Sequence, residues 1–321
     1  MLCPWWNCWL PPSDSFRLPG YDATASRPTR LPAIRSARPI RCHHPSRPEV
    51  ICLYQLERKY KMDLQLKNKR VIVTGGSRGI GLAIATAFAR EGALPLIVSR
   101  SQDSLTKAAA GIKVATGVEV ESLAADMATS QGLDDLLKAS GTADIVVNNA
   151  GAIPGGSLRE IDDAKWRQAW ELKLFGYINV VRAMLEQMES RGKGGVIANI
   201  IGMAGAAPRN EYLAGSTANA ALMAFTNAVG AASVRNGIRV FGINPSPTRS
   251  DRMETMMRAQ AEKKLGDPAR WTELTTNMPF GRLMEPQEVA DLTVFCCSPL
   301  SGYLSGSVIN LDGGQMYASP K

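Results

Sequence analysis

The sequence predicts an α/β fold in which one parallel sheet is doubly wound within a single domain spanning residues 62–321. Two observations support this prediction. Short apolar runs such as "RVIVTGG" (70–76) alternate with longer stretches of helical periodicity. The runs are also continuously apolar, as expected of strands covered by helices on both faces. Strands separated by helices favour a parallel sheet between two helical layers.

The expected elements follow one another along the chain from Lys69. Strands are expected at 70–76, 94–100, 118–126, 143–151, 194–202, 238–246 and 306–314. Helices are expected at 79–92, 104–116, 132–138, 164–191, 212–236 and 288–296. Because crossovers between parallel strands are right-handed, this order gives a Rossmann-type arrangement.

Composition separates the chain into two parts. The chain has 321 residues, of which 45% are hydrophobic, and no run of 18 apolar residues predicts a membrane span. Residues 1–61 hold ten Lys and Arg against four Asp and Glu, whereas residues 62–321 hold 27 against 25. The net charge of +8 therefore lies mostly in the first part, and the nearly neutral remainder argues against a nucleic-acid-binding protein.

Residues 1–61 are expected to be a disordered, basic, proline-rich extension. They hold nine of the 19 prolines, and "MLCPWWNCWLPPSD" lacks the long apolar core of a secretory signal. An organelle transit segment stays open, although we favour an upstream extension. Cys42, His43 and His44 have no second ligand pair at finger spacing, so no metal site is predicted. The six cysteines form no disulfide framework, and we expect a cytoplasmic protein.

A glycine-rich turn, "TGGSRGIG" (74–81), joins the first strand to the first helix. Gly75, Gly79 and Gly81 stand where a tight turn needs positive φ or a missing side chain. The helix that follows offers free N–H groups and a positive dipole end to a pyrophosphate. In this strand–turn–helix context the motif predicts dinucleotide binding.

Four motifs together resemble the short-chain dehydrogenase/reductase family. "TGGSRGIG", "NNAG" (148–151), "NPSP" (244–247) and "LDGG" (311–314) stand in that family's order and spacing, and the similarity covers about residues 66–316. The resemblance implies NAD(P)-dependent oxidation of alcohols or reduction of carbonyls. It further implies a homodimer or homotetramer. The departure at Ser246, where the family usually has glycine, is mild.

The charge beside the expected ribose site favours NADP(H), with NAD(H) still possible. An acid after the second strand would bind the ribose 2′-hydroxyl of NAD, but Ser99 and Arg100 stand there. Arg78 adds a second guanidinium suited to a 2′-phosphate, unless both arginines simply face solvent. From the turn and the resemblance together, the expected cofactor-binding residues are Gly75, Ser77, Arg78, Gly79, Ile80, Gly81, Arg100, Asp126, Asn148, Ala150, Gly151 and Thr248.

The active-site pattern of the family is broken in this chain. The family usually has a serine after the fifth strand, a tyrosine about a dozen residues later, and a lysine four residues after the tyrosine. Tyr212 fills the tyrosine position, but the serine position falls at Ile201 or Gly202, and the lysine position is Ser216. A tyrosine has a pKa near 10, so a proton donor at neutral pH needs a nearby cation.

Lys173 is a candidate for that cation. It stands where the family usually has an asparagine, on the long helix before the fifth strand. We hypothesise that Lys173 replaces the missing lysine and that Ser216 serves as a hydrogen-bond relay. The alternative is a solvated lysine on an amphipathic helix. Asn199 and Asn219 are expected to have structural roles.

Residues 248–283 are expected to line the ligand crevice, because they follow the carboxyl end of a strand. Met253, Met256 and Met257 fit either an adaptable apolar wall or ordinary packing. Arg249 and Arg252 are expected to be solvated rather than to bind an acidic substrate. The favoured function is reduction or oxidation of a small carbonyl or alcohol with Tyr212 as the proton donor. The alternative is a non-catalytic NADP(H)-binding protein.

Overall fold

The computed structural model describes residues 62–318. The expectations for the extension, including Cys42, His43 and His44, lie outside the described residues. Among residues 62–318, no helix combines the length and apolar character that a membrane crossing requires. The same part of the chain brings no three metal-ligating side chains together.

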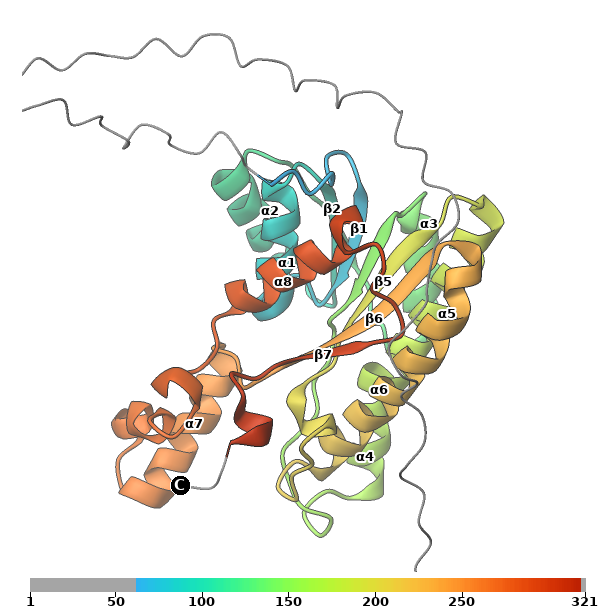
Figure 1. Ribbon diagram of the computed structural model, residues 1–321. Coiled ribbons are helices and arrows are strands. Elements are labelled where there is room, and N and C mark those ends of the chain that lie inside the picture. Colours follow the sequence, from blue (N-terminus) through green and yellow to red (C-terminus); the bar gives the residue numbers. More distant parts are fainter. Residues whose placement is uncertain (1–61, 319–321) are drawn as a thin grey trace, which may run out of the picture. The chain divides into compact units, whose positions relative to one another are not determined.

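Seven strands form one parallel sheet in the order β3-β2-β1-β4-β5-β6-β7 (Figure 1). Their bounds are β1 Arg70–Thr74, β2 Leu94–Ser99, β3 Glu121–Ala124, β4 Ile145–Asn148, β5 Gly195–Ile200, β6 Ile238–Pro245 and β7 Val308–Leu311. The strand order reverses direction between β1 and β4. The carboxyl ends of β1 and β4 form the switch point at which doubly wound sheets bind ligands. The strand order confirms the predicted fold class.

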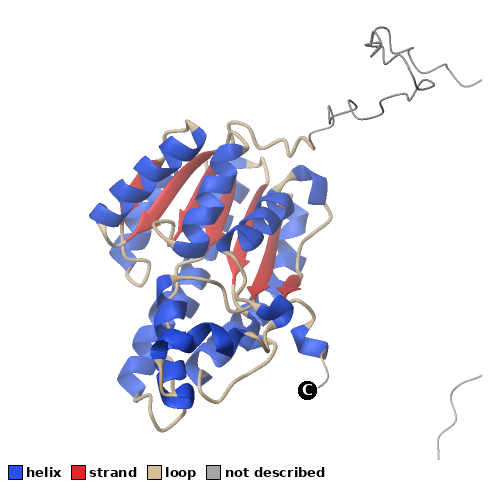
Figure 2. Cartoon of the chain, turned by 90° about the vertical axis from the view of Figure 1, so that its left-hand side faces the viewer, coloured by secondary structure: helices blue, strands red, loops and turns tan. Residues whose placement is uncertain are grey.

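Helices cover both faces of the sheet (Figure 2). Their bounds are α1 Gly79–Arg90, α2 Gln102–Thr116, α3 Ser130–Ser140, α4 Asp163–Trp170, α5 Gly176–Arg191, α6 Leu213–Ser233, α7 Asp251–Leu265 and α8 Pro286–Cys297. Helices α1, α2 and α8 pack on one face, and α3, α5 and α6 pack on the other. Helix α7 lies beyond the carboxyl ends of the strands.

Strand residues alternate between the two helical layers. Val71 and Val73 face the α1 side, whereas Ile72 faces the α5 side, and all three are fully buried. Because both faces are covered, every position of β1 except the first is buried. This explains why the sequence reads as continuous apolar runs.

The structure departs from the expected elements at two places. The helix expected at 164–191 is divided by a π-helical turn, Glu171–Phe175, which separates α4 from α5. Such turns insert one extra residue and commonly occur at functional sites. Helix α7 and the 3₁₀ helix Pro268–Thr275 were not predicted within the segment 248–283, which is the second difference.

Candidate active site

The candidate site lies at the carboxyl ends of the strands, where the loops after β1, β4, β5 and β6 meet. The first of these loops is a tight turn in which Gly75 and Gly79 have φ of +68° and +56°. A Cβ on Gly81 would lie 2.2 Å from the carbonyl oxygen of Gly75, so only glycine allows this approach.

The start of α1 suits a pyrophosphate. No side chain caps its first N–H groups, and its first turn holds no acid. A Cβ added to Gly79 would meet no atom within 4 Å, so the turn faces open space. Free amide groups and the helix dipole therefore point at a space that a phosphate can enter.

Asn149 fixes the shape of this turn and was not among the predicted residues. Its side-chain amide donates to the carbonyl oxygens of Thr74 (3.1 Å) and Gly75 (3.2 Å). The Thr74 hydroxyl in turn accepts from the backbone N–H groups of Asn149 and Ala150. Asn148, which was predicted, is instead buried and donates to Asn199 at 3.0 Å. The doubled asparagine in "NNAG" was the available signal.

Arg100 and Asp126 line one cavity of about 390 Å³, together with Leu172 and Lys165. Asp126 accepts a hydrogen bond from the backbone N–H of Ala128, which orients its carboxylate. Arg78 precedes α1 and is exposed, as is Arg100. Among residues 62–318, neither arginine forms an ion pair. Their guanidinium groups therefore have no acidic partner within the described chain.

Lys173 is buried, with only 8% of its surface exposed, so the alternative of a solvated lysine is wrong. Its amine donates to the carbonyl oxygen of Ile200 (2.8 Å) and to the hydroxyl of Tyr177 (3.0 Å). Burial lowers the pKa of Lys173 to about 7. A Cβ on Gly151 would lie 2.8 Å from Cδ of Lys173, so the lysine stem runs directly over the "NNAG" loop.

Tyr177 is a site residue that the sequence reasoning missed. It is 2% exposed, and its hydroxyl donates to the same Ile200 carbonyl at 2.8 Å. The amine of Lys173 also lies 4.5 Å from the centre of the Tyr177 ring. Burial, together with the nearby Tyr212 hydroxyl, raises the pKa of Tyr177 well above its ordinary value. No sequence signal beyond its place four residues after Lys173 pointed to it.

Tyr212 stands immediately before α6, and its ring lies over the first turn of that helix. A Cβ on Gly215 would come within 2.0 Å of the ring at Cε1, so the glycine makes room for it. Burial raises the pKa of Tyr212, and the positive charge of Arg252 acts against that rise. Tyr212 packs with Tyr177 and Ile153 in one apolar cluster.

Ser216 and the serine position have other partners. The Ser216 hydroxyl accepts from the backbone N–H of Arg209 at 3.0 Å and lies 3.4 Å from the Arg209 carbonyl oxygen. Among the described residues, the Ser216 hydroxyl forms no hydrogen bond to the side chain of Tyr212 or Lys173. The proposed role of Ser216 as a hydrogen-bond relay therefore has no supporting contact and stays a prediction. Gly202 has φ of +132° and a carbonyl that accepts from Asn219 at 3.4 Å.

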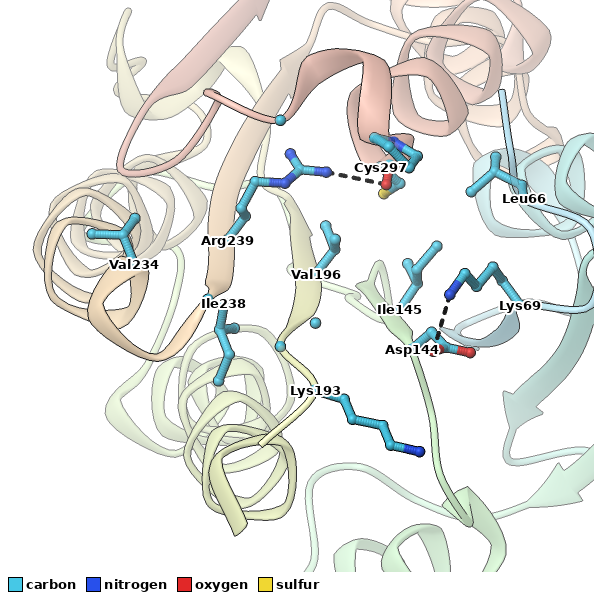
Figure 3. A pocket seen from close by; sticks show the side chains of 15 residues that line it. Leu66, Lys69, Asp144, Ile145, Lys193, Val196, Val234, Ile238, Arg239 and Cys297 are labelled. Carbon is cyan, nitrogen blue, oxygen red and sulfur yellow. Dashed lines mark hydrogen bonds and ion pairs between the residues drawn. The ribbon is translucent and has the colours of Figure 1, made fainter. Parts of the chain in front are cut away.

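A second cavity, of about 370 Å³, lies at the amino ends of the strands (Figure 3). Arg239 reaches across it and donates to the carbonyl oxygens of Cys296, Cys297 and Ser298, which closes the end of α8. Because the loops that carry the predicted site residues lie at the other end of the strands, this cavity is not part of the candidate site.

Comparison with known proteins identifies the family. Residues 69–261 match the family model described as short chain dehydrogenase. A 3-oxoacyl-acyl-carrier-protein reductase from Chlamydia muridarum is 31% identical over 259 residues, covering 79% of this chain and 99% of that protein. The 7alpha-hydroxysteroid dehydrogenase from Escherichia coli is 29% identical and covers 78% and 96%.

Solved structures agree. L-sorbose reductase from Gluconobacter frateurii, complexed with NADPH and L-sorbose, superposes with a TM-score of 0.75 at 32% identity. The match covers 80% of this chain and all of that one. With its glycine turn, its open helix start and its strand order, the chain belongs to the short-chain dehydrogenase/reductase family and is an NAD(P)-dependent oxidoreductase.

Proposed function

We propose that this enzyme is an NADP(H)-dependent reductase of small carbonyl compounds, or a dehydrogenase of the matching alcohols, with Tyr212 as the proton donor or acceptor. One observation carries the proposal. At the carboxyl edge of the sheet, the buried Lys173 amine donates to the hydroxyl of Tyr177, and Tyr177 packs in the same apolar cluster as Tyr212. The bound nicotinamide supplies or accepts the hydride.

Lys173 supplies the cation in this proposal, and it acts through Tyr177. The Tyr177 hydroxyl accepts from the lysine amine, and it interacts electrostatically with Tyr212. A protonated amine polarises the Tyr177 hydroxyl, and this lowers the cost of negative charge on the neighbouring phenol. Tyr212 then gives its proton to the carbonyl oxygen as the carbon is reduced.

NADP(H) is the preferred cofactor in this proposal. Arg100 lines the cavity that contains Asp126, Arg78 stands in the glycine turn before α1, and within residues 62–318 neither forms an ion pair. A 2′-phosphate accepts charge-assisted hydrogen bonds from two such guanidinium groups, whereas a 2′-hydroxyl leaves both charges unmatched. Ser77 and Ile80 are proposed to contact the phosphates through the turn backbone. Thr248, whose hydroxyl donates to Ser246 at 2.8 Å, is proposed to lie near the carboxamide.

The quaternary structure is proposed from helix α6. Its outward face is almost entirely alanine, because Ala220, Ala224, Ala228 and Ala231 are all exposed. Small side chains allow a second helix to approach closely, which supports a homodimer or homotetramer. We further propose that the enzyme is cytoplasmic. Its proposed ligands are small molecules, and we expect it to bind neither nucleic acid nor membranes.

The test is NADPH oxidation against a panel of ketones, aldehydes and quinones. We expect turnover with at least one carbonyl, and loss of turnover with retained NADPH binding in Tyr212→Phe. Lys173→Met is expected to lose most of the turnover and to change its pH profile. Full activity in Tyr212→Phe would end the assignment of the proton donor. NADPH binding without turnover of any carbonyl would favour the non-catalytic alternative.

A further inference from the structure

The segment between β6 and α8 contains five arginines, and only one of them lacks an acidic partner among residues 62–318. Four pair with glutamates, namely Arg249 with Glu285, Arg258 with Glu254, Arg270 with Glu273, and Arg282 with Glu288. Arg252, in the first turn of α7, forms no ion pair with any residue in 62–318. Arg249 and Arg252 are both exposed, as expected of solvated arginines, but they differ in that only Arg249 is paired with an acid.

Arg252 instead reaches toward the active site. Its guanidinium donates to the carbonyl oxygen of Ile153, in the loop that follows β4. Ile153 packs in the same cluster as Tyr212, and the Arg252 charge acts on the Tyr212 phenol. The side chain remains exposed, and a guanidinium has five N–H donors, so most of its donors stay available.

We propose that Arg252 binds a carboxylate of the substrate, so that the enzyme acts on oxo acids or the matching hydroxy acids. A guanidinium matches a carboxylate with two parallel hydrogen bonds, which fixes the orientation of the bound molecule. Held there, the substrate carbonyl lies beside Tyr212. The inference rests on the proposed role of Tyr212.

The test compares 2-oxo, 3-oxo and 4-oxo carboxylic acids with their methyl esters, using NADPH and the full chain. We expect kcat/KM for at least one acid to exceed that of its ester by about tenfold or more. Arg252→Gln should lose about tenfold on that acid and stay within about twofold on the ester. Arg258→Gln is the matched control, because this arginine lies on the same helix but is neutralised by Glu254. It should leave both values unchanged.

Equal kcat/KM values for acids and esters in the unmodified enzyme would overturn the proposal, even if Arg252→Gln failed to fold. An unchanged preference in Arg252→Gln would also overturn it. If no carbonyl is reduced at all, the proposed function is wrong, but the carboxylate site can still be tested by measuring binding with calorimetry. Oxamate, malonate or succinate should then bind the NADPH complex of the unmodified protein but not that of Arg252→Gln. Absence of binding by all three would exclude a carboxylate site.

Discussion

The amine of Lys173 lies 3.0 Å from the hydroxyl of Tyr177, and both groups donate to the carbonyl oxygen of Ile200. Among residues 62–318, the Lys173 amine forms no ion pair with a carboxylate. Two neutral oxygens thus hold a lysine that burial makes easy to deprotonate. Such a lysine fits a reaction in which its charge must change near neutral pH better than it fits a purely structural role.

Tyr177→Phe tests this pairing. The change removes one of the two acceptors of the Lys173 amine, and a hydrogen bond to a charged group is worth about 1.5–3 kcal/mol. We expect kcat for carbonyl reduction to fall about tenfold or more, with little change in NADPH affinity. The Lys173 pKa should drop, so the loss of activity on the alkaline side should begin at lower pH. An unchanged pH profile would mean that Tyr177 only fills space.

Lys173 should also make the stability of the protein depend on pH. Its pKa is about 7 in the folded state against 10.5 for the ordinary group, so the unfolded chain binds more protons between these values. Burial of Lys173 therefore destabilises the folded state most below pH 7. Between pH 7 and about 10.5, the free energy of unfolding should rise by about 1.4 kcal/mol per pH unit because of this residue.

Urea unfolding of the unmodified protein and Lys173→Met at pH 6 to 9 measures this effect. As the pH rises above 7, the free energy of unfolding of the unmodified protein should increase relative to that of Lys173→Met. Lys107→Met, at an exposed position of α2, should show a constant difference over the same range. A constant difference for Lys173→Met as well would show that the folded-state pKa is not lowered.

The sequence predicted the sheet and the nucleotide turn well because both depend on local patterns. Continuous apolar runs identify strands buried on both faces, and the glycines of 74–81 are required by backbone geometry. The active site was harder, because side chains distant in sequence assemble it. Tyr177 meets Ile200 across 23 residues, and Arg252 reaches Ile153 across 99. No spacing rule connects such pairs.

Gly215→Ala should impair the reaction by displacing Tyr212. An added Cβ would lie 2.0 Å from Cε1 of the ring, so the phenol has to move. We expect kcat to fall about tenfold or more, because small misplacements of a reacting group are costly. NADPH affinity should be unchanged. The matched control is Gly111→Ala in α2, where a Cβ meets nothing within 4 Å and should stabilise the helix by about 0.5–1 kcal/mol. Full activity in Gly215→Ala would show that the ring does not need this position.

Cofactor preference should depend on the arginine that follows β2. Arg100 lines the cavity that contains Asp126, and an acid at this place would instead accept a hydrogen bond from a ribose 2′-hydroxyl. In Arg100→Asp, the Kd for NADPH should rise about tenfold or more while the Kd for NADH stays equal or falls, because a 2′-phosphate then meets a negative charge. Arg90→Asp, an exposed change at the far end of α1, controls for the loss of positive charge and should alter neither Kd by more than about twofold.

Titration of NADPH and NADH fluorescence measures both constants, and an equal effect of the two variants on NADPH would mean that Arg100 acts only through overall charge. The preference for NADP(H) would then have to come from Arg78 alone, which Arg78→Ala would reveal by the same titration.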